Sequence, residues 1–305
     1  FLHRAQLLGR RRMEIEVDVR AVIDPRAKLG EGVLWDAQRD LVWFVDIKRH
    51  RLWYYDPASG NNGFAQAPDQ IGWAIPAEEG LLLCGLKTGL FTFDPDSEQF
   101  ERLVEVPGEP ANNRLNDACT DPWGRVWFGS MDDAEGQGSG RFYVFDRGEI
   151  TPAGPSGITI TNGPAVNAQG DRIYFTDTGG QKIMVAELSK DGLGEARPFA
   201  DTAALFPDAF PDGPVVDAED HVWTGLYMGA KVARFSPDGR LVATIDMPAR
   251  DITKMAFGGR DLSTAYVTTA TKNMTDEDMK HFPLAGSLLA FEAPVKGFEQ
   301  ARAKL

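Results

Sequence analysis

Short apolar and aromatic runs alternate with turn residues along the whole chain. Residues 41–46, 173–177 and 222–226 are three such runs, and the segments between runs are rich in Gly, Pro, Asp and Asn. β-Branched and aromatic residues in runs of this length favour strands, and no long stretch keeps the helical period of about 3.6 residues. The pattern predicts an all-β fold with one short helix over residues 275–280, which Thr275 would cap.

The runs recur with a regular spacing. Six residues that begin equivalent units lie 41 to 50 residues apart: Glu31, Gly72, Asn116, Asn162, Asp212 and Thr253. Repeats of roughly 40 to 50 residues, each with several short strands, are typical of propeller blades. The sequence therefore predicts a six-bladed β-propeller, in which equivalent positions of the units converge on one axis.

Turn motifs inside the units support this prediction. Residues 121–129 and 217–225 each begin with a tight turn that contains Asp and continue into an aromatic strand, and residues 236–239 are a Ser-Pro-Asp-Gly hairpin turn. The acidic residues after Asp94 have part of the spacing of a calcium-binding EF-hand loop, but Gln99 stands where that loop requires Gly. We expect a solvated hairpin there.

Length and composition agree with one closed β domain. The chain has 305 residues, 43% of them hydrophobic, and its 7 Trp and 18 Phe can fill the layers between packed sheets. No run approaches the roughly 20 apolar residues that span a bilayer. We expect a single domain over residues 13–305, preceded by an N-terminal extension, residues 1–12, that lies ahead of the natural start at Met13.

Charge and cysteine content narrow the range of partners. The chain has 45 acidic and 32 basic residues, a net charge of −13, and no Lys/Arg stripe. This balance argues against nucleic acid and against an anionic membrane surface as partners. Two cysteines, Cys84 and Cys119, do not make a disulfide framework, and we expect both to stay reduced in a cytoplasmic protein.

Several common catalytic centres are absent from the sequence. It has no Gly-x-Ser-x-Gly elbow, no Walker loop and no His-Glu-x-x-His motif, which argues against a serine hydrolase, a P-loop NTPase and a zincin. His50, His221 and His281 have no recognisable orienting partner. We therefore expect these histidines to be surface or packing residues and not catalytic bases.

Three side chains with oxygen donors occupy the same place in their units. Glu31 stands in Gly-Glu-Gly, Asn162 in Thr-Asn-Gly and Asp212 in Pro-Asp-Gly, and each Gly-containing turn should lead into the innermost strand of its blade. Asn-Gly and Asp-Gly alone are ordinary turn dipeptides, so it is the shared register that favours a site. Two carboxylates and an amide carbonyl suit Ca²⁺, Mg²⁺, Mn²⁺ or a comparable divalent ion, with positions left open for water or substrate.

A second polar group begins the third unit at the same end of the predicted channel. Arg114 can donate several fixed hydrogen bonds and Asn116 can both donate and accept, which suits a polyhydroxylated ligand. Arg114 could instead form an interblade salt bridge, and Asp117 could either join the site or cap a turn. Gln70 and Lys254 are further candidates for the mouth of the channel.

These motifs resemble those of one propeller family. The chain is similar to the gluconolactonase, regucalcin and senescence-marker-protein family over roughly residues 28–292. The matching segments are Leu29-Gly30-Glu31-Gly32 with Trp35, Asn113-Arg114-Leu115-Asn116-Asp117, Gly124-Arg125, Gly129-Ser130-Met131, Thr161-Asn162-Gly163 and Pro211-Asp212-Gly213. Details such as Asp46-Ile47-Lys48 and residues 85–89 are closer to bacterial aldonolactonases than to animal regucalcin.

The resemblance implies an activity and roles for individual residues. The protein would hydrolyse a sugar lactone, such as glucono-, xylono-, galactono- or arabinolactone, to its aldonic acid as a carboxylic-ester hydrolase. Glu31, Asn162 and Asp212 would bind one divalent ion, which could be Ca²⁺, Zn²⁺, Mg²⁺, Mn²⁺ or Fe²⁺. Arg114 and Asn116 would hold the substrate, and Asp212 would also act as the base.

The sequence departs from the family pattern at three places. Val33 stands where Pro is common, residues 167–170 replace a Ser-Pro-Asp-Gly turn, and Ala134 falls where the family has an acidic residue. Two alternatives to a sugar lactonase remain. One is a calcium-binding regulatory propeller without turnover, and the other is a metal-dependent esterase or lactonase with a different substrate range.

Overall fold

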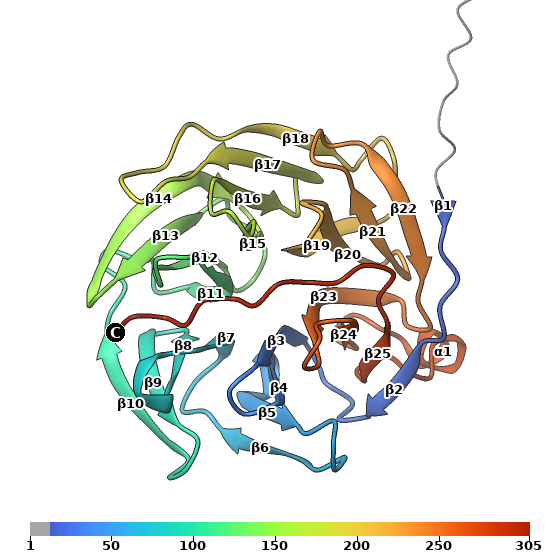
Figure 1. The fold of residues 1–305 in the computed structure, drawn as a ribbon, viewed down its shortest axis with the longest axis horizontal. Helices are drawn as coiled ribbons and strands as arrows, with labels where there is room; N and C mark the ends of the chain where they lie inside the picture. The colour runs from blue at the N-terminus through green and yellow to red at the C-terminus, as the bar shows by residue number, and fades with distance from the viewer. Residues whose placement is uncertain (1–12) are drawn as a thin grey trace, which may run out of the picture.

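The computed structural model describes residues 13–305, and the expected extension, residues 1–12, lies outside the described residues. The chain folds into a β-propeller whose sheets surround a common centre (Figure 1). The described part contains one α-helix, α1 (Asp276–His281), which Thr275 caps by accepting a hydrogen bond from the backbone N–H of Asp278. The all-β prediction and the short capped helix are both confirmed. No helix in the described range has the length and apolar character that a membrane span requires.

Four sheets of the described chain contain four strands each, in chain order from the centre outward. Their neighbouring strands are antiparallel. The strands are β3 (Gly30–Asp36), β4 (Leu41–Asp46), β5 (Arg51–Tyr55) and β6 (Asn62–Gln66); β7 (Ile71–Pro76), β8 (Leu82–Leu86), β9 (Gly89–Asp94) and β10 (Gln99–Val104); β11 (Asn113–Thr120), β12 (Val126–Asp132), β13 (Gly140–Asp146) and β14 (Glu149–Ile158); β15 (Thr161–Val166), β16 (Arg172–Asp177), β17 (Lys182–Glu187) and β18 (Arg197–Asp201). The hairpin expected after Asp94 is the connection between β9 and β10.

The fifth sheet of the described range has nine strands, so it departs from the separate blades that the repeat predicts. Its strands are β19 (Phe210–Val216), β20 (Val222–Tyr227), β21 (Lys231–Phe235), β22 (Leu241–Asp246), β23 (Asp251–Gly258), β24 (Thr264–Ala270), β25 (Leu288–Glu292), β1 (Met13–Glu14) and β2 (Arg20–Ile23). One parallel pair, Gly213 with Lys254, joins β19 to β23. The two backbones can approach here because Gly213 has no side chain between them.

The two ends of the described chain meet in this last sheet. β2 pairs antiparallel with β25, and β1 pairs parallel with β22. The innermost strands β3, β7, β11, β15, β19 and β23 contact one another in turn around a closed ring. Each of them contains one of the six residues that the sequence placed at the start of a unit, so the repeat is confirmed as a repeat of inner strands.

Large aromatic side chains fill the layers between neighbouring sheets. The ring centroids of Trp73 and Phe128 lie 5.7 Å apart, and those of Phe142 and Phe175 lie 4.8 Å apart. All four rings are almost fully buried. Aromatic contacts of this kind add to the large apolar burial that holds packed sheets together.

The two turn-and-strand motifs have the same internal hydrogen bonds. The Trp223 indole N–H donates to the Asp217 carboxylate at 2.8 Å, and Trp127 donates to Asp121 in the same way at 2.9 Å. Asp217 is fully buried and also accepts a hydrogen bond at 2.9 Å from Nε of Arg234. Each Asp therefore fastens its turn to the strand that follows it.

We expect Asp217→Ala to lower the free energy of unfolding by about 2–4 kcal/mol, because the change leaves Trp223 and Arg234 without a buried partner. Equilibrium unfolding in urea measures the loss. Glu219→Ala is the matched control, since Glu219 pairs with the same Arg234 but is 60% exposed, and exposed pairs contribute no more than about 1 kcal/mol. Equal losses in the two variants would contradict the role given to Asp217.

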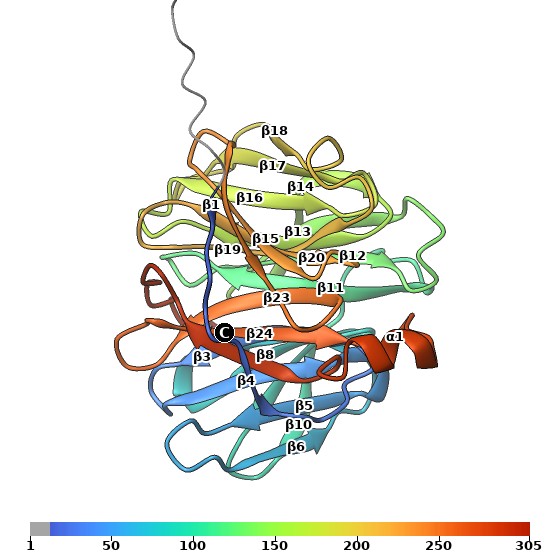
Figure 2. The same ribbon diagram turned by 90° about the vertical axis from the view of Figure 1, so that its right-hand side faces the viewer.

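The C-terminal segment, residues 296–305, crosses the centre of the ring on one face (Figure 1). Hydrogen bonds fasten it to strands or turns of different sheets: Ala218 N–H to the Lys296 carbonyl at 2.9 Å, Thr120 Oγ1 to the Ala301 carbonyl at 2.7 Å, and Ala303 N–H to the Pro76 carbonyl at 2.8 Å. Figure 2 shows α1 on the opposite side of the molecule. We call residues 296–305 the strap; no pattern in the sequence predicted its path.

Candidate active site

The inner strands are irregular at the positions predicted to carry the site. The pairing register of each shifts close to its unit residue, between Glu31 and Leu34 in β3 for example. The sequence suggested turns ahead of the strands, whereas the structure has β-bulges inside them. Gly32 and Gly163 adopt the left-handed φ values of +59° and +75° that such kinks need, which explains the Gly after two of the predicted donors.

One pocket brings together the predicted donors and the predicted substrate residues. Glu31, Asn162 and Asp212 line it, and so do Arg114 and Asn116. The pocket and its opening to solvent together occupy about 420 Å³, and each of these five side chains is no more than 5% exposed. It lies on the α1 side of the ring, since Lys272 and Asn273, which precede α1, form part of its wall.

A chain of hydrogen bonds connects these side chains. Nη1 of Arg114 donates to Oδ1 of Asn116 at 2.6 Å, and Nδ2 of Asn116 donates to Oδ1 of Asn162 at 3.0 Å. Nδ2 of Asn162 then donates to Oγ1 of Thr178 at 2.9 Å, and Thr178 donates to the Pro211 carbonyl at 2.8 Å. The orientation of the Asn162 amide is therefore fixed from both ends.

Burial changes the acidity of the two carboxyl groups in the pocket. It raises the pKa of Glu31 to about 8, and the negative charge of Asp117 adds to the effect. Burial also raises the pKa of Asp212 well above its ordinary value, and the charges of Glu31 and Asp117 act in the same direction. Both groups ionise more easily if positive charge enters the pocket.

The donor set fits a divalent cation. Oδ1 of Asp212 is buried and accepts no hydrogen bond from an N–H or hydroxyl group within residues 13–305. The Glu31 carboxyl lies within hydrogen-bond reach of the Asp212 side chain, so this oxygen needs a cation, a water or a proton shared between the two carboxyl groups. Within residues 13–305 no three His, Cys, Asp or Glu side chains form a metal-binding group. A cation in this pocket would depend on the Asn162 amide oxygen as the third donor, and oxygen donors alone suit hard divalent ions.

Arg114 also forms a salt bridge, which was the alternative to a role in the site. The bridge lies within one sheet and not between blades. Nε of Arg114 donates to Oδ1 of Asp133 at 2.9 Å, and Asp133 directly follows β12, the neighbour of β11. Lys48 and Gln70 hold the same carboxylate, at 2.5 Å and 3.0 Å. Gln70 is therefore connected to Arg114 by way of Asp133, but it is not part of the pocket wall.

Asp117 and Lys254 lie outside this pocket, deeper in the ring. Their side chains form a buried ion pair, and Oδ2 of Asp117 accepts a hydrogen bond from the Gly163 N–H at 2.8 Å. Both line a second cavity of about 920 Å³ on the face that the strap crosses. That cavity has mostly apolar walls and includes neither Glu31 nor Asp212.

Several wall residues escaped the sequence analysis. Thr178 and Tyr227 line the pocket, and Glu135 forms an ion pair with Lys272 between two loops of its wall. Ala134, where the family pattern has an acidic residue, lies between two acidic residues: Asp133, which pairs with Arg114, and Glu135, which pairs with Lys272. The proximity of Lys272 to Glu135 depends on how two loops far apart in the chain fold over the ring.

Comparisons with known proteins agree with this geometry. Residues 29–271 match the family model described as SMP-30/Gluconolactonase/LRE-like region. The chain belongs to this family. It is 29% identical to the 6-deoxy-6-sulfogluconolactonase of Pseudomonas putida, over 92% of this chain and 96% of that protein, and 32% identical to the pentonolactonase of Haloferax volcanii, over 83% and 85%.

A solved structure of a regucalcin has the same fold as this chain. The regucalcin of Agrobacterium tumefaciens, described as a calcium-binding protein, superposes with a TM-score of 0.90 at 26% identity and covers 95% of this chain and 98% of that one. The resemblance drawn from the motifs is therefore confirmed. The chain is a member of a family of sugar lactone lactonases and regucalcins.

Proposed function

We propose that this protein hydrolyses a sugar lactone to its aldonic acid with the help of one divalent cation. The observation that carries the proposal is the pocket in which the oxygen donors Glu31, Asn162 and Asp212 meet, with Oδ1 of Asp212 accepting no N–H or hydroxyl hydrogen bond within residues 13–305. Relatives named as lactonases, similar over most of the chain, support the reaction class. The calcium-binding description of the Agrobacterium regucalcin supports the cation. A cytoplasmic location remains part of the proposal.

Glu31, Asn162 and Asp212 would hold the cation. When bound, it supplies a positive charge that polarises the lactone carbonyl and stabilises the oxyanion formed on attack by water. Thr178 orients the Asn162 side chain for this role. Its hydroxyl oxygen accepts a hydrogen bond from Nδ2 of Asn162 at 2.9 Å, so the amide oxygen points away from Thr178. Thr178 is thus a positioning residue in this mechanism.

Asp212 would move the proton. As the water oxygen bonds to the carbonyl carbon, Asp212 takes one proton from the water. It then returns that proton to the ring oxygen as the bond between this oxygen and the carbonyl carbon breaks, so one water is consumed and one hydroxy acid forms. Burial raises the pKa of Asp212, whereas the charge of a bound cation would lower it and so favour the ionised carboxylate that accepts the proton.

Arg114 and Asn116 would bind the hydroxyl groups of the sugar. Arg114 uses Nε and Nη1 inside the protein, and no partner is found for its Nη2 within residues 13–305. A guanidinium fixed by two bonds with a further donor available can bind a polar ligand at little entropic cost. This arrangement favours a hydroxylated lactone over an apolar ester.

We further propose that the nine-stranded sheet serves as two blades, which makes the propeller six-bladed. One blade would contain β19 to β22, and the other β23 to β25 with β2 as its outer strand. The single bridge between Gly213 and Lys254 supports this division, because no other strand pairing within residues 13–305 joins the two groups. Each of the six inner strands would then begin one blade.

A calcium-binding protein without turnover is the second candidate, and the structural similarity to the Agrobacterium regucalcin favours it. The two functions can be separated by assay. We expect chelator-treated protein to be inactive and the same protein with Ca²⁺, Mn²⁺ or Zn²⁺ to release acid from at least one of gluconolactone, xylonolactone, galactonolactone and arabinolactone. A pH indicator follows the release, with an aryl ester as the comparison substrate. Cation binding with no hydrolysis of any lactone would support the second candidate.

A further inference from the structure

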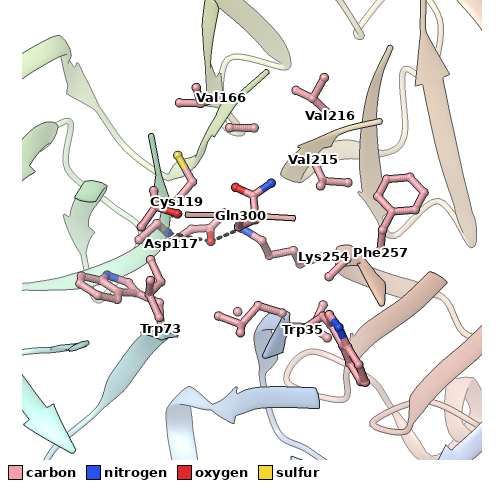
Figure 3. A pocket seen from close by; sticks show the side chains of 18 of the residues that line it. Trp35, Trp73, Asp117, Cys119, Val166, Val215, Val216, Lys254, Phe257 and Gln300 are labelled. Carbon is pink, nitrogen blue, oxygen red and sulfur yellow. Dashed lines mark hydrogen bonds and ion pairs between the residues drawn. The ribbon is translucent and has the colours of Figure 1, made fainter. Parts of the chain in front are cut away.

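The Asp117–Lys254 ion pair lies at the centre of the ring, in the wall of the larger cavity (Figure 3). On the strap side the pair lines the larger cavity, into which Gln300 of the strap also points. On the other side lie the candidate cation ligands. The pair therefore forms the floor that separates the proposed active site from the rest of the channel.

Both members of the pair contact the residue that follows a candidate ligand. Oδ2 of Asp117 accepts a hydrogen bond at 2.8 Å from the N–H of Gly163, the residue after Asn162. Lys254 packs on Gly213, the residue after the proposed base, and a Cβ atom on Gly213 would lie 2.9 Å from Cγ of Lys254. The pair thus fixes the backbone next to two of the three ligands.

The pair also contributes to the net charge of the buried ionisable side chains around the site. Glu31, Asp117 and Asp212 are carboxylates, and Lys254 is the cation placed among them. With all four ionised, the net charge is minus two, which one divalent ion balances. Burial and the charge of Asp117 raise the pKa of Glu31, whereas the positive charge of Lys254 opposes the rise, so the influence of Lys254 reaches the ligand set.

We propose that the Asp117–Lys254 pair is a positioning device that tunes how strongly this site binds a divalent cation. The inference rests on the proposed cation site. Lys254 repels the ion and Asp117 attracts it, so their effects on affinity have opposite signs. The number of charges around a site is one of the means by which proteins set calcium affinity. Together the two residues keep the affinity moderate and hold the ligands in place when the cation is absent.

A double-mutant cycle tests the proposal with Ca²⁺ as the probe. Calorimetric titration of chelator-stripped protein should show that Lys254→Met binds Ca²⁺ at least about tenfold more tightly and Asp117→Asn at least about tenfold more weakly. The double variant restores the net charge of the wild-type group, so its affinity should return to within about threefold of wild type. Lys190→Met, which removes an exposed charge outside the site, is the control and should leave the affinity unchanged.

A purely structural role for the pair gives a different pattern. Both single variants would then bind Ca²⁺ more weakly, in step with their unfolding temperatures, and this outcome overturns the proposal, as does unchanged affinity in both. If Lys254→Met does not fold, Asp117→Asn and the double variant still report the sign of each effect. Calorimetry does not involve the lactone, so a failure of the lactone assays would leave this result standing. Wild-type protein that binds no Ca²⁺ would overturn the inference.

Discussion

Replacing Asp212 with Ala should reduce the rate of lactone hydrolysis by at least about 100-fold, because the change removes the proposed base and one of three cation ligands together. The metal-free Asp212→Ala protein should be no less stable than the wild type. The pKa of Asp212 is raised by burial, so its ionisation opposes folding when no cation is bound. We therefore expect metal-free Asp212→Ala to unfold at a temperature equal to or above that of the wild type at pH 8.

Two measurements check this result. Steady-state kinetics with an active lactone and saturating Ca²⁺ gives the change in kcat/KM, and thermal unfolding in the presence of chelator gives the stability. Asp191→Ala is the matched control, since Asp191 is an exposed residue in the loop between β17 and β18. Full activity in Asp212→Ala would remove Asp212 from the mechanism. If the variant loses activity because it no longer folds, the proposed chemical role of Asp212 is contradicted.

Removal of the cation should abolish activity and make stability depend on pH. Without a cation, the pKa of Glu31 is about 8 in the folded protein, compared with an ordinary value of 4.5. The unfolded chain releases this proton at lower pH than the folded chain, so rising pH favours unfolding across the interval from 4.5 to about 8. The raised pKa of Asp212 acts in the same direction. The loss from Glu31 alone should be on the order of several kcal/mol.

Thermal unfolding between pH 5 and pH 8, with chelator and with excess Ca²⁺, measures this dependence. The chelated protein should lose stability as the pH rises, whereas Ca²⁺ should offset the loss because it binds the ionised carboxylates of the folded state. Lactone hydrolysis should fall at least about 100-fold with chelator and return with added Ca²⁺. Equal slopes in the two conditions would show that no cation binds to Glu31 and Asp212.

The repeat and the inner strands could be predicted because they are local properties of the sequence. A strand needs a run of suitable residues and a turn needs Gly, Pro, Asp or Asn, and both signals lie within a few positions of each other. Glu31, Asn162 and Asp212 occupy equal places in the repeat, so closure of the ring is enough to bring them into one pocket. The Asp–Trp bonds of the two turn motifs are local too, spanning six residues each.

The remaining parts of the site depend on contacts between distant residues. Lys254 and Asp117 are 137 positions apart, and so are Lys272 and Glu135. Whether such a pair forms depends on side-chain direction at a bulge and on loop conformation, and neither follows from the spacing of residue types. The bulges could not be distinguished from turns for the same reason, since Gly after a polar residue is common in both.

The pairing of β2 with β25 has a consequence for how the protein is made. Ile23 pairs with Leu288, so β2 waits for a partner strand that is synthesised 265 residues later. During translation the sheets that precede β25 can form as they leave the ribosome, but the circle stays open until β25 emerges. Until that moment an unpaired strand edge is available to other nascent chains. Chaperone capture of chains that are truncated before β25, but not of chains that include it, is the expected cellular sign of this late closure.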